Sequence, residues 1–113
     1  MHEMTIAENL IDLIQVEALA QSFSRVRRVG VQLGALGHVE PEALLFCFDA
    51  VAQGSVAEGA VLAVEIVAGS GWCPGCEKTV AIAQRYDLCP ICGQTHVKMI
   101  AGDALRLTEL EVE

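Results

Sequence analysis

Four of the five cysteines fall into two C-x-x-C pairs, a spacing that suits a single metal ion. The pairs are Cys73–Cys76 and Cys89–Cys92, and twelve residues separate them in CPGCEKTVAIAQRYDLCPIC. A tight turn in each pair brings two thiols together, and the intervening residues are enough for a hairpin that returns to the same ion. Four thiolates match tetrahedral zinc, with Zn–S bonds of about 2.3 Å. We therefore predict a zinc ribbon in which all four bind structural Zn(II).

Two alternatives remain open for the four cysteines. Four thiolates also suit iron, as in an electron carrier, and a C-x-x-C pair can act as a redox-active dithiol. A closed four-thiolate site leaves no position for a substrate, so we expect it to hold the fold rather than to catalyse a reaction. The fifth cysteine, Cys47, lies on the apolar side of a predicted helix, and we interpret it as a small buried hydrophobic residue.

The start of the chain, MHEM, offers donor atoms of a different kind. The Met1 amine, the His2 backbone nitrogen and the His2 imidazole can close two adjoining chelate rings around one ion. These donors are roughly coplanar, and planar nitrogen ligands suit Ni(II) or Cu(II) rather than zinc. One corner stays open, and water, Glu3, His38 or His96 would fill it. Such an exchangeable corner suits a metal that is transferred.

The same residues also have an ordinary interpretation. A histidine at position 2 is usually a solvated terminal residue, and short motifs produce many false matches. Glu3 can simply favour the positive end of a helix electrostatically. His38 and His96 lie in predicted loops and have no informative spacing. The residues alone therefore leave the nickel hypothesis open.

Composition limits the class of protein. The chain has 113 residues, 53% of them hydrophobic, and a net charge of −8. This acidity argues against nucleic-acid binding, which needs a basic surface. The sequence has neither a signal-peptide pattern nor an apolar run long enough to span a membrane. Paired cysteines without these features indicate a cytoplasmic protein whose thiols hold metal.

Hydrophobic periodicity predicts the elements that must position these residues. One helix has its apolar side chains at helical spacing, with Thr5 and Glu8 as a capping box or a start slightly earlier: Ala7, Leu10, Ile11, Ile14 and Ala18. A second helix lies in 38–54, with Pro41 at its first position and Gly54 as its C-terminal cap. Alternating residues predict strands near 29–33, 60–69 and 103–113.

These elements define an α+β fold: a small mixed three-stranded sheet with two helices, plus an inserted four-cysteine zinc-ribbon module. Because the cysteines precede the last strand, we predict a discontinuous α/β domain at 1–68 and 104–113. The zinc-ribbon domain would then occupy 69–103. The glycine-containing stretches 68–71 and 101–103 are predicted as hinge segments, and Gly34 and Gly37 are expected to loosen the chain.

Several motifs occur in one order along the chain: MHEM, VEPEALLFCFDAV, two C-P-x-C pairs and ALRLTELEVE. In this combination the sequence resembles the HypA/HybF family of hydrogenase nickel-incorporation proteins over essentially its whole length. The resemblance implies a nickel metallochaperone, not an enzyme. It implies nickel binding by His2, with Met1 and Glu3 around it, and zinc binding by the four paired cysteines.

The resemblance also implies partners. These are the GTPase HypB and the large subunit of nickel–iron hydrogenase, or urease in some relatives. An alternative from a different class is a zinc-ribbon adaptor that binds other proteins without transferring nickel. The two hypotheses differ at His2, which the adaptor would not need.

Overall fold

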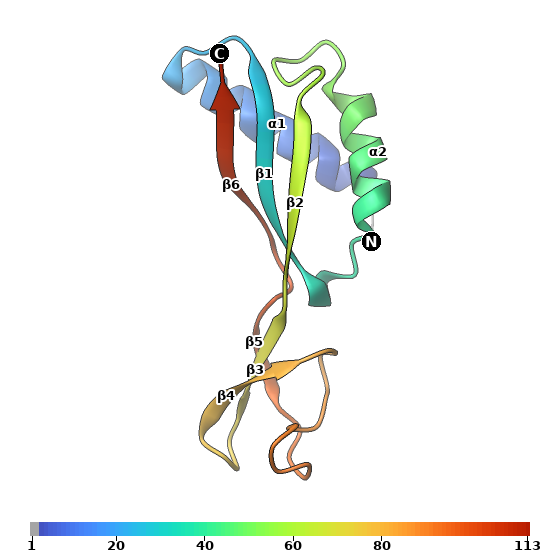
Figure 1. Cartoon of the computed structure of the whole chain (residues 1–113), viewed down its shortest axis with the longest axis vertical. Helices are drawn as coiled ribbons and strands as arrows, with labels where there is room; N and C mark the ends of the chain where they lie inside the picture. Colours follow the sequence, from blue (N-terminus) through green and yellow to red (C-terminus); the bar gives the residue numbers. More distant parts are fainter. Residues whose placement is uncertain (1–2) are drawn as a thin grey trace. The chain divides into compact units, whose positions relative to one another are not determined.

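The computed structural model describes residues 3–113, which form two α-helices and two three-stranded sheets (Figure 1). The elements follow in this order: α1 (Glu3–Gln21), β1 (Val26–Gly34), a short 3-10 helix η1 (Ala35–Gly37), α2 (Pro41–Ala52), β2 (Val61–Val67), β3 (Gly69–Cys73), β4 (Lys78–Ile82), β5 (Lys98–Ala101) and β6 (Leu105–Val112).

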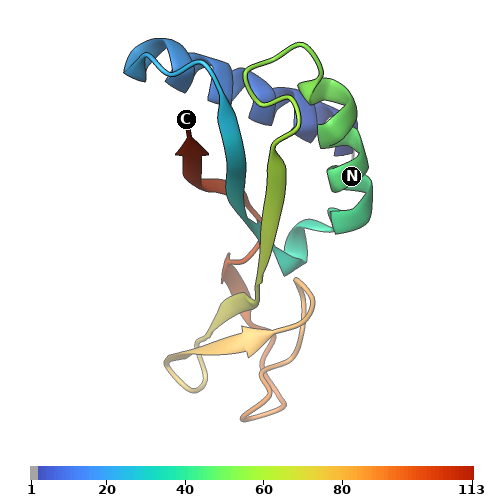
Figure 2. The same cartoon turned by 45° about the horizontal axis from the view of Figure 1, so that its top comes forward.

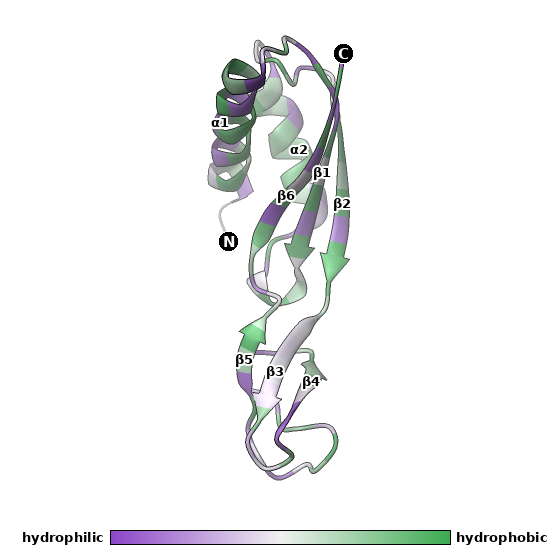
Figure 3. Ribbon diagram, turned by 90° about the vertical axis from the view of Figure 1, so that its left-hand side faces the viewer, coloured by the Kyte–Doolittle hydropathy of each residue, from purple (hydrophilic) through white to green (hydrophobic). Residues whose placement is uncertain are grey.

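The first sheet has the strand order β2-β1-β6, and both helices lie on one of its faces (Figures 2 and 3). Strands β1 and β2 run in the same direction and β6 runs in the opposite one, so the sheet is mixed as predicted. The predicted α+β class, with two helices on a small sheet beside a four-cysteine module, is confirmed.

Both helices follow from their sequence patterns. The five apolar residues that predict α1 are its buried residues, and α1 packs against α2. Pro41 is the first residue of α2, where its missing N–H costs nothing, and Gly54 adopts a positive φ of 81° just beyond its end. Leu44 and Phe48 are fully buried beneath α2. Periodicity is therefore sufficient to locate these helices.

Some details differ from the prediction. Helix α1 already includes Glu3, so Thr5 lies inside the helix and does not cap it. Leu13 of α1 and Leu45 of α2 lie beside the buried stripes but are exposed, Leu13 by 46%. The apolar stripe of each helix is wider than the surface that the three strands cover, so residues at its margin stay in contact with solvent.

The second sheet has the order β4-β3-β5. Strand β3 pairs antiparallel with β4, from Gly69 opposite Ile82 to Cys73 opposite Lys78, and antiparallel with β5 on its other side. The stretch 68–71 was predicted as a hinge; residues 69–71 belong to β3, and the hinge itself stays a prediction. Glycine and serine have low strand propensity, but here the pairing on both sides fixes the strand.

The chain divides into two compact units. The first contains the described residues up to Val31, then Val39–Glu65 and Arg106–Glu113; the second contains Gln32–His38 and Ile66–Leu105. The segment 32–38, which sequence analysis placed with the α/β domain, thus belongs to the same compact unit as the cysteines. The assignment of 69–103 as a separate zinc-ribbon domain stays a prediction.

A close backbone contact explains why the segment 32–38 belongs to the second unit. The Gly34 N–H donates to the Ala104 carbonyl at 2.9 Å, and the Leu36 N–H donates to the Gly102 carbonyl at 2.8 Å. A β-carbon on Gly34 would lie 2.3 Å from the carbonyl carbon and oxygen of Gly102. Gly34 therefore permits a tight crossing of two main chains, rather than loosening the chain as predicted.

Replacing Gly34 with alanine should destabilise the protein by about 3 kcal/mol, the cost of overpacking against atoms that cannot rotate away. Gly34 has an ordinary φ of −68°, so the loss would come from this contact alone. Gly59→Ala is the control: its β-carbon would meet nothing within 4 Å, although its φ is 77°. Urea denaturation of both variants measures the difference. Equal stability of Gly34→Ala and the unaltered protein would show that the crossing is looser.

Within residues 3–113, neither helix combines the length and the apolar character that crossing a membrane requires.

Candidate metal centre

The two C-x-x-C pairs come together as one cluster of four sulfur atoms. The four Sγ atoms all lie within 4.8 Å of one another. The Cys73 and Cys92 sulfurs are 3.9 Å apart, as are those of Cys76 and Cys89. A tetrahedron with Zn–S bonds of about 2.3 Å has sulfur–sulfur edges of about 3.8 Å. The cluster thus has the dimensions of a tetrathiolate metal site, and its four cysteines are free thiols.

Each pair is held in a tight turn in which a backbone N–H points at the first sulfur. The Cys76 N–H donates to Cys73 Sγ and the Ile91 N–H donates to Cys89 Sγ, both at 3.4 Å. The residue that follows each pair has a positive φ, 51° at Glu77 and 68° at Gly93. The repeated C-P-x-C sequence therefore forms two similar turns, and the second uses the residue type that tolerates this conformation best.

The turns and their surroundings set the thiol pKa values unequally. Backbone N–H groups of Gln94 and Thr95 lower the pKa of Cys92 to about 6. The backbone N–H of Cys92, followed by that of Ile91, lowers the pKa of Cys89. Desolvation, followed by hydrogen bonding to the neighbouring thiols, raises the pKa of Cys76 to about 12. Part of the cluster is therefore anionic near neutral pH, and a bound cation would displace the remaining protons.

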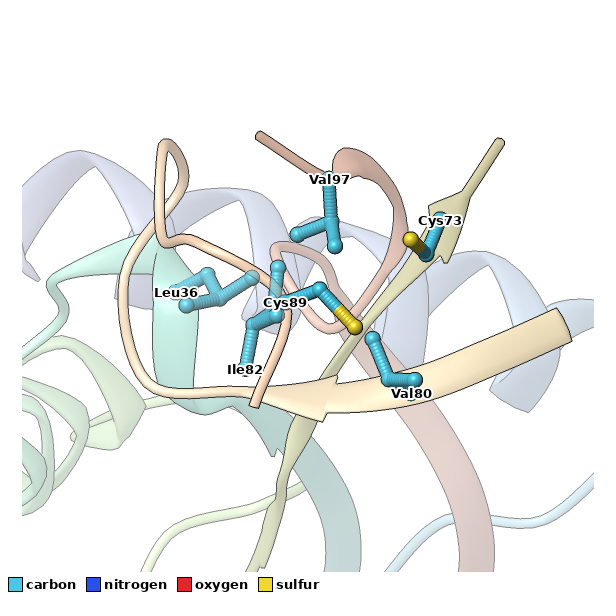
Figure 4. Close-up of a cluster of buried hydrophobic side chains, with 6 residues drawn as sticks. All are labelled: Leu36, Cys73, Val80, Ile82, Cys89 and Val97. Carbon is cyan, nitrogen blue, oxygen red and sulfur yellow. The ribbon is translucent and has the colours of Figure 1, made fainter. Parts of the chain in front are cut away.

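Two of the cysteines also form part of the core of the second unit. Cys73 and Cys89 are buried beside Val80, Ile82 and Val97, and Leu36 completes this cluster (Figure 4). Cys76 and Met99 pack against it and are only partly buried. Because this core contains four aliphatic side chains besides the two thiols, apolar burial alone provides limited stability, and a metal would contribute much of the folding free energy.

Glu77→Gly should stabilise the protein by about 1 kcal/mol, since a non-glycine residue with positive φ is strained. The matched change Gly93→Ala removes the glycine from the equivalent place in the second turn and should destabilise by a similar amount. Thermal unfolding of the zinc-loaded variants gives both values. A lower midpoint for Glu77→Gly would mean that the Glu77 side chain makes a contact worth more than the strain.

The predicted nickel ligands lie at the beginning of the chain. Met1 and His2 are outside the described residues. Glu3 begins α1, and its carboxylate accepts a hydrogen bond at 3.2 Å from the backbone N–H of Glu40, the residue that caps α2. Glu3 therefore connects the first turn of α1 to the start of α2, a role that its sequence position did not suggest.

Among the described residues, the sulfur cluster includes neither of the two remaining histidines nor the fifth cysteine. His38 is exposed and has a left-handed φ of 57° at the end of η1. The His96 Nδ1 lies 3.0 Å from the Tyr86 carbonyl oxygen. A carbonyl can only accept a hydrogen bond, so Nδ1 is the donor, and Nε2 remains available as an acceptor or ligand. Cys47 is half-buried on α2.

Sequence reasoning missed the groups that stabilise the thiolates. The backbone N–H groups of Gln94 and Thr95 lower the pKa of Cys92. No pattern of side chains in the sequence indicates that these N–H groups point at the sulfur. Gly75 provides a partial signal, because a β-carbon there would lie 2.9 Å from the Thr95 hydroxyl and 3.8 Å from Cys73 Sγ. The glycine in CPGC thus leaves room for the loop that surrounds the sulfur atoms.

Taken together, the fold and the sulfur cluster define a class: a small α+β metal-binding protein with a closed four-cysteine site. The chain also matches, over residues 1–112, the family model described as hydrogenase/urease nickel incorporation, metallochaperone, hypA. The protein therefore belongs to the HypA family of nickel-incorporation metallochaperones, which take part in hydrogenase maturation. The resemblance found in the sequence is confirmed. This is a family of metal carriers rather than enzymes.

Individual relatives agree with this assignment. The chain is 54% identical to the hydrogenase maturation factor HypA of Methylocella silvestris and 52% identical to that of Rhodopseudomonas palustris, over 100% of each chain. Its fold is similar to the solution structure of the nickel metallochaperone HypA from Helicobacter pylori, with a TM-score of 0.74. That match covers 99% of this chain and 97% of the other, at 24% identity. The last comparison supports the fold alone.

Proposed function

We propose that this protein binds Ni(II) at its N-terminus and delivers it during maturation of a nickel–iron hydrogenase. The observation that carries the proposal is the family match over residues 1–112, which includes the MHE start as well as both cysteine pairs. The hydrogenase maturation factors of M. silvestris and R. palustris align with the entire chain, which supports the same client process.

The chemistry of the donors assigns the two metals to different places. Cys73, Cys76, Cys89 and Cys92 would hold Zn(II), whose preference for tetrahedral thiolate ligands fits the 3.9 Å sulfur separations. Bound zinc would supply structural stability and would leave no coordination position open. A metal that is carried and released needs an exchangeable ligand, so the nickel site must lie elsewhere in the chain.

The beginning of the chain provides suitable nickel donors. The Met1 amine, the His2 backbone nitrogen and the His2 imidazole would bind Ni(II) in one plane, the geometry that this ion favours with nitrogen ligands. Glu3 contributes beside them. Its carboxylate accepts a hydrogen bond from the Glu40 backbone N–H, which ties the first turn of α1 to the start of α2. Nickel binding would release protons, so its affinity would fall as the pH is lowered.

Delivery requires partner proteins. The family role in hydrogenase maturation supports docking to a HypB-type GTPase and to the hydrogenase large subunit, and these are the partners that we propose for this chain. We place this protein and both partners in the cytoplasm. Reducing conditions there would keep the four cysteines available for zinc.

A nickel titration of the zinc-loaded protein tests the proposed function. The protein should have an untagged N-terminus, and His2→Ala should be titrated beside it. We expect one Ni(II) per chain in the unaltered protein, none at this site in His2→Ala, and one zinc in both. The His96→Ala variant, titrated in parallel, tests whether His96 supplies the fourth nickel ligand, because it leaves the N-terminal donors in place. Unaltered nickel binding by His2→Ala would place the nickel away from the N-terminus. Absence of specific nickel binding by the unaltered protein would leave the adaptor hypothesis in place, and coloured protein as purified would indicate iron.

A further inference from the structure

A groove of about 610 Å³ runs between α1 and β6 within the first compact unit. The metal sites described above do not use it. It is lined from the helix side by residues of α1 and the turn after it, and from the sheet side by most of β6: Leu13, Glu17, Gln21, Phe23, Arg106, Leu107, Thr108, Glu109, Leu110 and Val112. Figure 3 shows α1 and β6 in this region, with apolar and polar bands along the strand.

The lining residues indicate that the groove follows the edge of β6. Residues 106–110 all line it, although successive side chains of a strand point to opposite faces. A cavity over one face would be lined by alternate residues only. Strand β6 is the last in the order β2-β1-β6, and among residues 3–113 no strand pairs with its outer side. Its outer N–H and carbonyl groups are therefore placed to pair with an added strand.

This edge lacks two of the residue types that most often prevent pairing. The sequence LRLTELEV contains no proline and no lysine, which many proteins place on edge strands to block association. Apolar surface lies along the groove: Leu13 is 46% exposed and Val112 is 41% exposed, while Leu107 and Leu110 are half-buried. An added strand would thus gain backbone hydrogen bonds and would cover apolar side chains.

The charges in and beside the groove favour a basic occupant. Glu17 and Glu109 line it, Glu111 continues along the same strand, and Arg106 is the one basic residue in the lining. Pairing with a second copy of this chain is disfavoured. In a two-fold antiparallel pair of β6 strands with the greatest overlap, Glu109 lies opposite or diagonal to the Glu109 of the other copy. Like charges at such positions are destabilising.

We propose that the outer edge of β6, with this groove, binds an extended segment of a partner protein that alternates apolar and basic side chains. The segment would add to the sheet as a fourth strand, so backbone pairing would provide affinity and the groove would select the side chains. This binding site is independent of nickel and zinc, because every residue that lines the groove lies in α1, the following turn or β6.

A model peptide of roughly ten residues, alternating lysine with valine or threonine, tests this proposal on the zinc-loaded full chain. We expect saturable binding by fluorescence anisotropy at physiological salt, and slower hydrogen exchange of β6 amides. A peptide with glutamate in place of lysine should bind at least about tenfold more weakly, as should one that is N-methylated at alternate amides to remove its edge hydrogen bonds. Equal binding of the N-methylated peptide would overturn strand addition.

A matched pair of variants locates the binding. Leu13→Arg places a positive charge in the groove and should weaken binding of the lysine peptide at least about tenfold. Leu19→Arg makes the same change on the same helix, at a residue that is 85% exposed and does not line the groove, and should have less than about a twofold effect. Leu13→Ala provides a second variant without added charge, and thermal unfolding checks that each variant folds.

Several results would contradict the proposal. These are absence of saturable binding, equal weakening by Leu13→Arg and Leu19→Arg, or unaltered exchange of the β6 amides. Self-association in sedimentation that Leu13→Arg abolishes and Leu19→Arg leaves intact would also overturn it, because the groove would then be an interface between two copies of this chain.

Discussion

Replacing Cys73 with serine should remove zinc from the protein and unfold the second compact unit. Cys73 is fully buried in a core that contains only four aliphatic side chains besides Cys73 and Cys89. Binding of structural zinc contributes about 10–16 kcal/mol in zinc-finger peptides, more than such a small core provides. A serine hydroxyl is a poor zinc ligand and would also be buried beside apolar groups.

Metal analysis and two-dimensional NMR measure this effect. We expect less than one zinc for every chain in Cys73→Ser, together with loss of dispersed amide signals from residues 66–105. Cys47→Ser is the matched control, because Cys47 is half-buried on α2 and lies outside the four-cysteine cluster. It should retain a full complement of zinc. Full zinc in Cys73→Ser with unaltered signals would show that the four sulfurs do not hold the metal together.

The second large effect concerns the first residue. Three alanines added ahead of Met1 should reduce nickel binding below detection, because the Met1 amine becomes an amide and the new terminal amine lies too far along the chain from His2 to close adjoining chelate rings. The chelate rings through His2 then lose their terminal member. Zinc content and thermal stability should stay unaltered, since the described part of the chain places the sulfur cluster in the other compact unit from the start of α1.

A matched control adds the same three alanines after Glu113, at the opposite end of the chain. This variant should bind nickel like the unaltered protein in calorimetric titration. Undiminished nickel affinity after the N-terminal addition would refute the chelate hypothesis. Loss of nickel binding after both additions would point to a general effect of lengthening the chain.

Much of the fold could be predicted because its elements depend on local periodicity. The buried residues of α1 follow the helical spacing from Ala7 to Ala18, and Pro41 marks the start of α2. The cysteine spacing predicted the cluster because two tight turns and a hairpin leave few ways to arrange four sulfurs. The alternation in 103–113 correctly predicted β6, although not the unpaired edge that it presents.

Features that depend on contacts between distant residues were not predictable. Gly34 contacts Gly102, which is 68 positions further along the chain (102 − 34). Nothing in the sequence around either glycine indicates that the two are in contact. Strand β3 contains Gly69 and Gly71, and its conformation results from its two neighbours rather than from its own propensity. The amides that lower the Cys92 pKa belong to a loop whose path only the folded chain defines. Met1 and His2 lie outside the described residues, so the nickel role proposed for them rests on donor chemistry and on the family match.

The most direct test of the central claim is the nickel K-edge X-ray absorption spectrum of zinc-loaded, untagged protein with one Ni(II) bound. If nickel binds at the N-terminus, the spectrum should show a four-coordinate planar site with nitrogen and oxygen neighbours and no sulfur. Ni–S scattering would place the nickel on Cys73, Cys76, Cys89 and Cys92 instead, and would contradict the assignment of separate sites to the two metals.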